Sequence, residues 1–360
     1  MGARYFGASV LRAEDESLLT GRGAYVDDIT RPGMVHAAFV RAEYAHALIR
    51  GIDTTAAEAV EGVIAVITND TLPDDLRDKR MAQPYPAPML KQGICCHILA
   101  AGEVNYVGQT VAMVVAKSRH VAEDAAALIM VDYEPLEAVV DCRKAFEQGA
   151  PLAHQGAPDN IAATLRASFG DVEQAFADAD HVVRVSDHHH RGGCHAMETR
   201  GAIGENDAAR GELALWSSTQ CPYLVRRLVA KHLDIAESSL RVIAPDVGGG
   251  FGPKAGVYPE EVMVVVAARM LGRPVKWIED RREHFTATQT QRDQFWELEA
   301  AVASNGKVLG VRGRIIHDNG AFVPYGLLLP LTTLGPLPGP YAIKNLDVTL
   351  EAVFTNTTPN

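Results

Sequence analysis

SLRVIAPDVGGGFGPK, residues 239–254, is the segment that says most about the fold. Its first nine residues are mostly apolar and predict a strand over Ser239–Val247. The strand runs directly into Gly248-Gly-Gly-Phe-Gly252, with four glycines in five residues. Because ordering glycine costs conformational entropy, so dense a group indicates that the backbone closely approaches another group here.

A glycine turn of this kind exposes backbone N–H groups that can form a concave site for anionic oxygens. It is not a nucleotide-binding P-loop, because Pro253 precedes Lys254 and Ala255 follows it. It is also a poor dinucleotide fingerprint, since its third glycine falls one residue early and the next helix begins several residues late. Two interpretations stay open here: a tight structural turn without a ligand, and a cradle for an anionic cofactor.

A second candidate site residue, Gln220, lies between a strand that ends at Trp216 and a helix predicted over Pro222–Leu233. Ser218 or Thr219 can cap this helix, and Pro222 suits its first turn. The amide of Gln220 is therefore expected at the end of the sheet. There it either caps the helix, faces solvent or belongs to a site.

The whole chain predicts an α+β fold in two domains. Residues 1–150 alternate strand and helix signals, including Thr110–Ala116, an apolar run typical of a strand buried on both faces. Residues 151–170 lie where the composition turns to Gly, Ala, Pro and Asn, which predicts a linker. Residues 171–360 carry further strands and a helix over Pro259–Leu271 that is apolar nearly all round and hence buried.

A hairpin is predicted by two strand patterns, Gln294–Ala303 and Lys307–His317, that flank Asn305-Gly306. Asn-Gly is typical of the type I′ turn.

Composition excludes several classes of function. The formal net charge is −11 and there is no basic block, so no nucleic acid is expected as a partner. No apolar run reaches the ~18 residues of a membrane span, and the start has no apolar signal-peptide core. We therefore expect no membrane span and a cytoplasmic protein. The 5 cysteines predict neither a disulfide framework nor an iron–sulfur cluster held by this chain.

The stretch Asp187-His-His-His-Arg191 has the residue types of a metal site without its spacing. In a strand, His188 and His190 point to one face and His189 to the other, so at most two could converge. We interpret it as a solvated strand end and predict no metal ligands in this chain.

Several motifs follow one another along the chain. They are Leu18–Asp28, Arg41–Ala47, Tyr106–Ala112, Val131–Leu136, Met197–Arg200, Ser218–Gln220, Gly248–Lys254 and Val275–Arg281. Together they resemble the molybdenum-binding large subunit of the xanthine dehydrogenase/aldehyde oxidase family, close to its carbon-monoxide-dehydrogenase-like members. The resemblance covers the N-terminal half of that subunit, in order, and is more specific than any single motif.

This resemblance implies an a/b hammerhead domain over residues 1–150 and the first, incomplete part of the molybdopterin-binding region over residues 171–360. The family binds molybdopterin cytosine dinucleotide or plain molybdopterin, whose dithiolene holds the molybdenum, so no metal ligand is expected from this chain. By the resemblance, Gln220 would hydrogen-bond an oxo ligand of molybdenum. The residues that would line the cofactor are Gly249, Gly250, Phe251 and Gly252.

The implied activity is that of a molybdenum hydroxylase subunit, which oxidises or hydroxylates an aldehyde or the carbon of an N-heterocycle. Electrons would pass to 2Fe–2S and FAD, carried by partner subunits. Ala255 stands where purine-oxidising relatives carry a glutamate, so xanthine is not the expected substrate.

Two family features are not found in this chain, which stops at Thr355–Asn360: an Arg-Gly-Ala-Gly segment and the catalytic glutamate. We therefore expect a chain that is inactive alone and works with a chain carrying the remaining molybdopterin-binding region. Two other hypotheses stay open. One is a non-catalytic chain that completes a cofactor pocket whose base lies on another chain, and the other is an unrelated nucleotide-binding protein.

Overall fold

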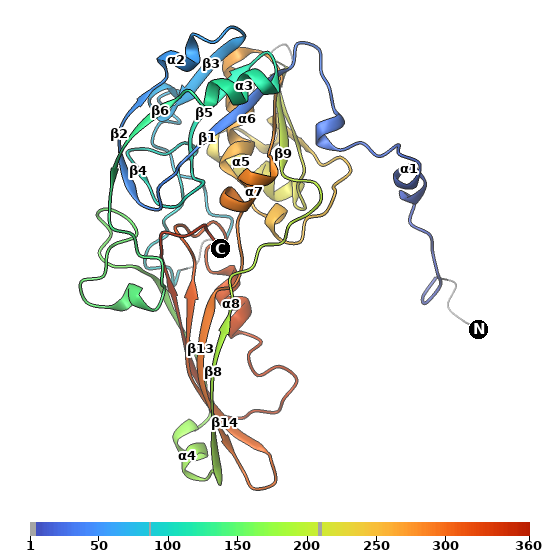
Figure 1. Cartoon of the computed structure of the whole chain (residues 1–360). Helices are drawn as coiled ribbons and strands as arrows, with labels where there is room; N and C mark the ends of the chain where they lie inside the picture. The colour runs from blue at the N-terminus through green and yellow to red at the C-terminus, as the bar shows by residue number, and fades with distance from the viewer. Residues whose placement is uncertain (1–4, 86–87, 208–210) are drawn as a thin grey trace.

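The computed structural model describes residues 5–85, 88–207 and 211–360, so residues 1–4 of the expected hammerhead domain lie outside it. The predicted α+β class is confirmed. Figure 1 shows a body of sheets and helices from which a long sheet projects. The helices are α1 (Asp15–Leu19), α2 (Thr55–Glu58), α3 (Arg119–Ala126), α4 (Val172–Ala177), α5 (Pro222–His232), α6 (Pro259–Leu271), α7 (Arg281–Ala287) and α8 (Leu328–Leu334).

A seven-stranded sheet forms the body and combines both halves of the sequence. Its strands, in spatial order, are β11 (Leu240–Ile243), β10 (Glu212–Ser217), β9 (Gly201–Asp207), β12 (Val275–Ile278), β1 (Val35–Arg41), β5 (Thr110–Ala116) and β3 (Val63–Thr68). β1 pairs in parallel with β12 and antiparallel with β5. A strand from the first predicted domain therefore lies beside a strand from the second, and the two regions share one sheet.

Helix α6 forms the centre of the core. It has the predicted bounds, and residues 262–268 along it are fully buried. Gly272 ends the helix in the left-handed conformation, with φ 63°, as glycine commonly does after a helix. α6 packs against β9, β10 and β12, so its apolar surface is covered on the sheet side.

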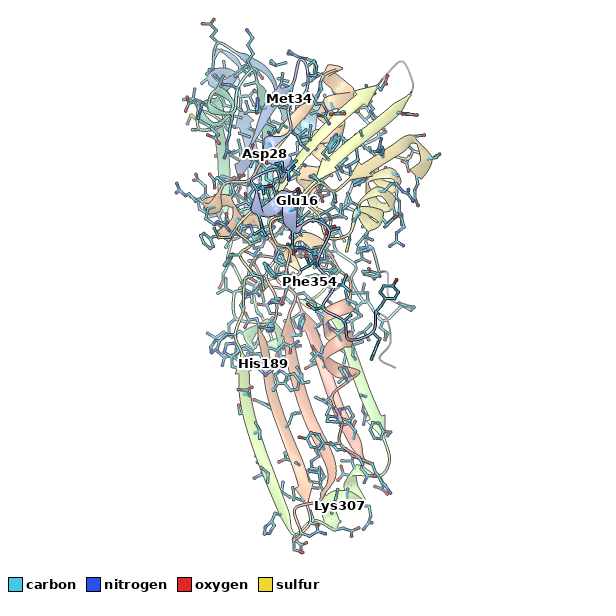
Figure 2. All side chains as sticks on the ribbon, turned by 90° about the vertical axis from the view of Figure 1, so that its right-hand side faces the viewer. Glu16, Asp28, Met34, His189, Lys307 and Phe354 are labelled. Carbon is cyan, nitrogen blue, oxygen red and sulfur yellow. The ribbon has the colours of Figure 1, made fainter. Side chains whose placement is uncertain are left out.

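The projecting sheet has five strands and corrects the linker prediction. Their spatial order is β7 (Ile161–Phe169), β15 (Leu346–Val353), β14 (Val308–Asp318), β13 (Gln294–Val302) and β8 (His181–His189). β7 lies within residues 151–170, so the linker prediction is wrong for this segment. Its alternating pattern is short, and its partner β15 lies far away in sequence. Figure 2 places Lys307 at the tip of this sheet and Phe354 near the body.

The predicted hairpin forms, but its turn differs from the prediction. Among the two predicted turn residues, only Gly306 has a positive φ, of 83°. Its N–H donates to the carbonyl of Ala303 (2.8 Å), and Ala303 N–H donates to Lys307 (2.9 Å). A type I′ turn needs positive φ at both central residues, so the type I′ prediction is wrong.

A small sheet and an extended arm complete the chain. The small sheet consists of β4 (Glu103–Val104), β2 (Ala47–Asp53) and β6 (Met130–Pro135). The segment with α1 extends away from the body. Within the described ranges, we find no helix whose length and apolar character would allow it to cross a membrane.

Candidate functional site: a glycine turn held by a glutamate

The glycine turn follows β11, which ends at Ile243 and is therefore shorter than the strand predicted over Ser239–Val247. Gly249, Phe251 and Gly252 have φ values of 101°, 57° and 103°. Positive φ is unusual for a bulky residue such as Phe251, so surrounding contacts must hold this conformation. Phe251 is 66% exposed. The turn thus presents an open face with an aromatic ring on it.

Gln220 holds one side of this turn. Its backbone N–H donates to the carbonyl of Lys254 (2.9 Å), and its Oε1 accepts the N–H of Gly252 (2.9 Å). A Cβ on Gly250 would lie 2.4 Å from Cδ of Gln220, so any other residue there would displace the Gln220 side chain. The structure therefore brings the predicted residues Gln220, Gly250 and Gly252 together. Since Oε1 is already bonded, the Nε2 amide of Gln220 is the group left to donate to a ligand.

Ser218 and Thr219 do not cap α5 as predicted. The residue before the helix is Cys221, whose N–H donates to Thr219 Oγ1 (3.1 Å), while Ser218 Oγ donates to Glu198 (2.9 Å). Pro222 does occupy the first turn, as predicted. The hydroxyls before α5 therefore support the glycine turn and its neighbours.

The backbone of the turn fits an anionic group. Within the described part of the chain, the N–H groups of Gly249, Gly250 and Phe251 have no protein acceptor, although most backbone donors in folded proteins are paired. Open space lies beside them, because a Cβ on Gly252 would meet no atom within 4 Å. Successive N–H groups in a turn of mixed handedness form a concavity for anionic oxygens. These residues therefore suit phosphate or other anionic oxygens of a cofactor.

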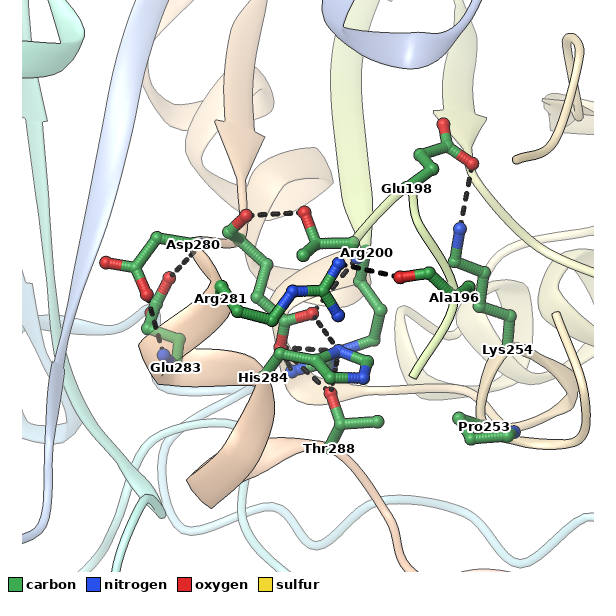
Figure 3. A network of polar contacts seen from close by, with 12 residues as sticks. Ala196, Glu198, Arg200, Pro253, Lys254, Asp280, Arg281, Glu283, His284 and Thr288 are labelled. Atoms are coloured by element: carbon green, nitrogen blue, oxygen red, sulfur yellow. Dashed lines mark hydrogen bonds and ion pairs between the residues drawn. The ribbon is translucent and has the colours of Figure 1, made fainter. Parts of the chain in front are cut away.

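A network of buried charges lies next to the turn (Figure 3). Arg200, 5% exposed in its side chain, pairs with Glu279 (2.5 Å) and Glu260 (3.3 Å) and lies over the ring of Tyr258 at 3.9 Å. Burial alone would raise the pKa of Glu279 and Glu260, but the charge of Arg200 together with hydrogen bonds to both groups, and with Arg41 at Glu260, lowers both. His284 Nδ1 also lies 2.9 Å from Glu279. The negative charges of Glu279 and Glu260 are therefore balanced by the positive charge of Arg200 within the buried network.

Glu261 of α6 is a buried carboxyl with a different balance. It contacts Ser217 Oγ at 2.5 Å, accepts the N–H of Tyr258 (3.0 Å), and has no ion-pair partner among the described residues. Burial raises the pKa of Glu261 to about 7. The native state therefore holds a proton on Glu261 that the unfolded chain releases above its usual pKa of 4.5.

We expect Glu261→Gln to stabilise the protein at pH 8 but hardly at pH 5. The stabilising contribution of the Glu261 proton is complete below pH 4.5 and is lost as pH rises through about 7. The amide of Gln mimics the protonated carboxyl at every pH, so the free energy of unfolding at pH 8 should rise by about 1–3 kcal/mol. Urea unfolding at both pH values measures this. An equal effect of the substitution at pH 5 and pH 8 contradicts it.

Sequence reasoning missed the role of Glu198. It lies in the Met197–Arg200 motif, yet nothing in its spacing indicates that it contacts both Ser218 and Lys254. The available signal was Lys254, which follows the glycine turn but lacks the spacing of a P-loop lysine. If such a lysine is buried and does not bind phosphate, it needs a carboxylate as counterion.

The histidine stretch lies at the end of β8, as expected. The rings of His188 and His190 lie 4.1 Å apart, and His189 stacks on Trp296 at 5.1 Å. Nε2 of His188 donates to the carboxylate of Asp293 (2.9 Å). No group of three or more potential ligands that could hold a metal ion occurs within residues 5–85, 88–207 and 211–360.

Two sequence families match the chain. Residues 20–137 match the a/b hammerhead domain of aldehyde oxidase and xanthine dehydrogenase, and residues 153–360 match a molybdopterin cofactor-binding domain. Their order agrees with the predicted regions, while the division at residues 150 and 171 stays a prediction. The hypothesis of an unrelated nucleotide-binding protein is wrong.

Individual relatives agree with these matches. The chain is 40% identical over 360 residues to the nicotine 6-hydroxylase large subunit of Paenarthrobacter nicotinovorans, covering 98% of this chain and 43% of that protein. It is 37% identical over 360 residues to the carbon monoxide dehydrogenase large chain of Afipia carboxidovorans, covering 96% and 44%. Quinoline 2-oxidoreductase from Pseudomonas putida 86 superimposes with a TM-score of 0.91 at 37% identity, covering 98% and 45%.

The chain thus spans less than half the length of these relatives. The molybdopterin match alone extends over more than half of the chain, and it contains both Gln220 and the glycine turn. The chain therefore belongs to the aldehyde oxidase and xanthine dehydrogenase family of molybdopterin-dependent oxidoreductases.

Proposed function

We propose that this chain forms one wall of the molybdopterin site of a molybdenum hydroxylase. The observation that carries the proposal is the row of N–H groups of Gly249, Gly250 and Phe251, which have no protein acceptor within the described residues and lie beside the amide of Gln220. Anionic cofactor oxygens are the acceptors that such a row suits. Membership in the family supports molybdopterin as that cofactor, and we propose its cytosine dinucleotide form.

Molybdopterin, when bound, would supply a redox-active molybdenum held by its own dithiolene. The residues of this chain bind and orient it. The turn would donate its backbone N–H groups to anionic oxygens of the cofactor, and Gln220 would donate through its Nε2 amide. Phe251 borders the site as an exposed aromatic residue. None of these residues is a metal ligand, and the proton-accepting base of the reaction is proposed to lie outside this chain.

The substrate class that we propose is an aldehyde or an N-heterocycle oxidised at a ring carbon. A cavity of about 160 Å³ adjoins the turn at Gly252 and Pro253 and is bordered by Tyr325, Leu328 and Leu329. Its apolar walls suit a flat, weakly polar molecule. The names of two relatives, a nicotine 6-hydroxylase and a quinoline 2-oxidoreductase, support the heterocycle.

Further parts are needed for turnover. The relatives are more than twice as long as this chain. We propose that a segment equivalent to the part of the relatives that this chain does not cover supplies the remaining molybdopterin-binding region and the base. That segment lies on the same or on another polypeptide. We further propose that electrons leave through a 2Fe–2S subunit and an FAD subunit. Some relatives are themselves described as large subunits or as subunits of a complex, which supports an assembly.

The test is the metal and pterin content of the complex purified with its native partners. About one molybdenum and one pterin per chain, together with dye reduction by quinoline or an aldehyde, are expected. A loaded complex that is inactive toward both substrate classes would favour the alternative of a non-catalytic chain that only completes the pocket. A complex without molybdenum or pterin refutes the proposal.

We expect Gln220→Ala to slow turnover by about 10²–10³-fold while molybdenum is retained. Loss of one preorganised donor that acts on developing charge has an effect of this size. The matched control is Gln174→Ala, an exposed glutamine on α4 at the far end of the projecting sheet. Steady-state kinetics and metal analysis of both variants decide the matter. Full activity of a loaded Gln220→Ala complex contradicts the role of Gln220.

A further inference from the structure

One carboxylate oxygen connects three separate segments of the site. Oε2 of Glu198 accepts the backbone N–H of Gly248 (2.7 Å), the ammonium group of Lys254 (2.8 Å) and the hydroxyl of Ser218 (2.9 Å). Gly248 begins the glycine turn and Lys254 follows it, while Ser218 lies two residues before Gln220. Both ends of the turn and the segment that carries Gln220 therefore meet at one atom.

The packing around Glu198 leaves little freedom. A Cβ on Gly248 would lie 2.5 Å from Cβ of Glu198, so the turn can approach this side chain only because residue 248 is glycine. Lys254 is buried, with 2% exposure, and its pKa is lowered by burial despite the neighbouring carboxylate. Glu198 is thus the counterion that a buried lysine requires.

The ammonium group of Lys254 lies against Glu198 (Figure 3). This lysine is therefore engaged inside the protein, unlike a P-loop lysine, which reaches a phosphate. The donors available to a ligand are the N–H groups of Gly249, Gly250 and Phe251, whose arrangement depends on where the two ends of the turn are held.

We propose that Glu198 is a positioning residue that sets the shape of the cofactor cradle by holding Gly248, Lys254 and Ser218 on one oxygen. The inference rests on the proposed function of the turn as a molybdopterin site. Because all three donors meet on Oε2, Glu198 acts on the cradle through the groups it holds. Its loss loosens the turn and the Gln220 segment together, without unfolding the sheet behind them.

The test compares two double variants in the purified complex, Glu198→Gln/Lys254→Met and Glu198→Leu/Lys254→Met. Both remove the buried ion pair, so neither leaves an uncompensated charge, and neutral replacements of similar size are often tolerated. Only glutamine keeps an oxygen that can accept from Gly248 and Ser218. The control is Glu205→Leu, which breaks the ion pair of Glu205 on β9 with Arg31 (2.6 Å), a pair that contacts neither end of the glycine turn.

Hydrogen exchange of peptides covering residues 244–256 and 217–222 gives a readout that is independent of activity. In the leucine variant these amides should exchange about tenfold faster or more, because each lost hydrogen bond weakens local closure. The pterin content should fall about tenfold. The glutamine variant and Glu205→Leu should stay near the wild type in both measurements.

Equal exchange in the two double variants overturns the inference, because the bond-accepting oxygen then has no effect on the turn. So does a loosened turn in the leucine variant with undiminished pterin content. A wild-type complex without pterin refutes the proposed function instead, and the exchange comparison still decides whether Glu198 organises the turn.

Discussion

Gly250→Val and Gly252→Val are expected to abolish cofactor loading while the protein stays folded. At Gly250 the added Cβ would lie 2.4 Å from Cδ of Gln220, so that side chain has to move and releases the N–H of Gly252. At Gly252 the added Cβ meets no atom, but φ of 103° disfavours a β-branched residue. The turn therefore changes shape in both variants, for two different reasons.

Pterin and molybdenum content of the purified complex measure this effect. Less than about a tenth of the wild-type loading is expected, since a misfit of about 1.4 kcal/mol already weakens binding tenfold. The matched control is Gly306→Val at the tip of the hairpin, where φ is 83° and a Cβ also meets nothing within 4 Å. Normal loading in both site variants would mean that the turn is structural and holds no cofactor.

Arg200→Ala is expected to produce the largest loss of stability. It leaves Glu260 and Glu279, which are 2% and 1% exposed, without their shared counterion. Removing one partner of a buried ion pair typically costs about 3–5 kcal/mol, a large part of the total stability of a domain. We therefore expect a clearly lower Tm, or aggregation during expression. Arg166→Ala is the control, because the exposed pair of Arg166 with Asp347 is screened by solvent.

The pH dependence of Arg200→Ala separates charge from packing. In the wild type, burial is outweighed by Arg200 acting together with the hydrogen bonds to both glutamates and with Arg41 at Glu260. The pKa of both is lowered, so their contribution to stability is present at neutral pH and lost on acidification. Without Arg200, both glutamates lose a charge that lowers their pKa, although Glu260 keeps its ion pair with Arg41 (2.5 Å). The destabilisation caused by Arg200→Ala should then be smaller at pH 5 than at pH 8. A destabilisation that does not depend on pH would indicate lost packing against Tyr258.

Local patterns in the sequence were sufficient to predict the helices and strands whose apolar pattern continues without interruption. The helix over Pro259–Leu271 has its predicted bounds, because an apolar segment bounded by Pro259 and Gly272 has few alternatives. Strand β5 likewise coincides with the run Thr110–Ala116. The density of glycines after Val247 indicated a close approach, and the contact between Gly250 and Gln220 is one.

Strands whose partners lie far away in the sequence could not be predicted in this way. Strand β7 was predicted to be part of a linker, because its partner β15 lies almost 200 residues away in the sequence. Strand β12 has only 4 residues, too few for a clear strand pattern. A strand of this length is stable only through the neighbours that pair with it. Strands β1 and β12 pair with each other although they lie far apart in the sequence, and the residue pattern of neither strand predicts this pairing.

The sequence by itself determined the fold class, the family and the existence of the glycine turn, because motif order and turn chemistry can be read from the chain without its tertiary contacts. Only the tertiary structure decided that Glu198 binds Gly248, Lys254 and Ser218, and that Arg200 lies between two buried glutamates. The physical reason is that a charged side chain is stabilised by whatever group reaches it within about 3–4 Å, and that proximity is created by chain folding across many residues.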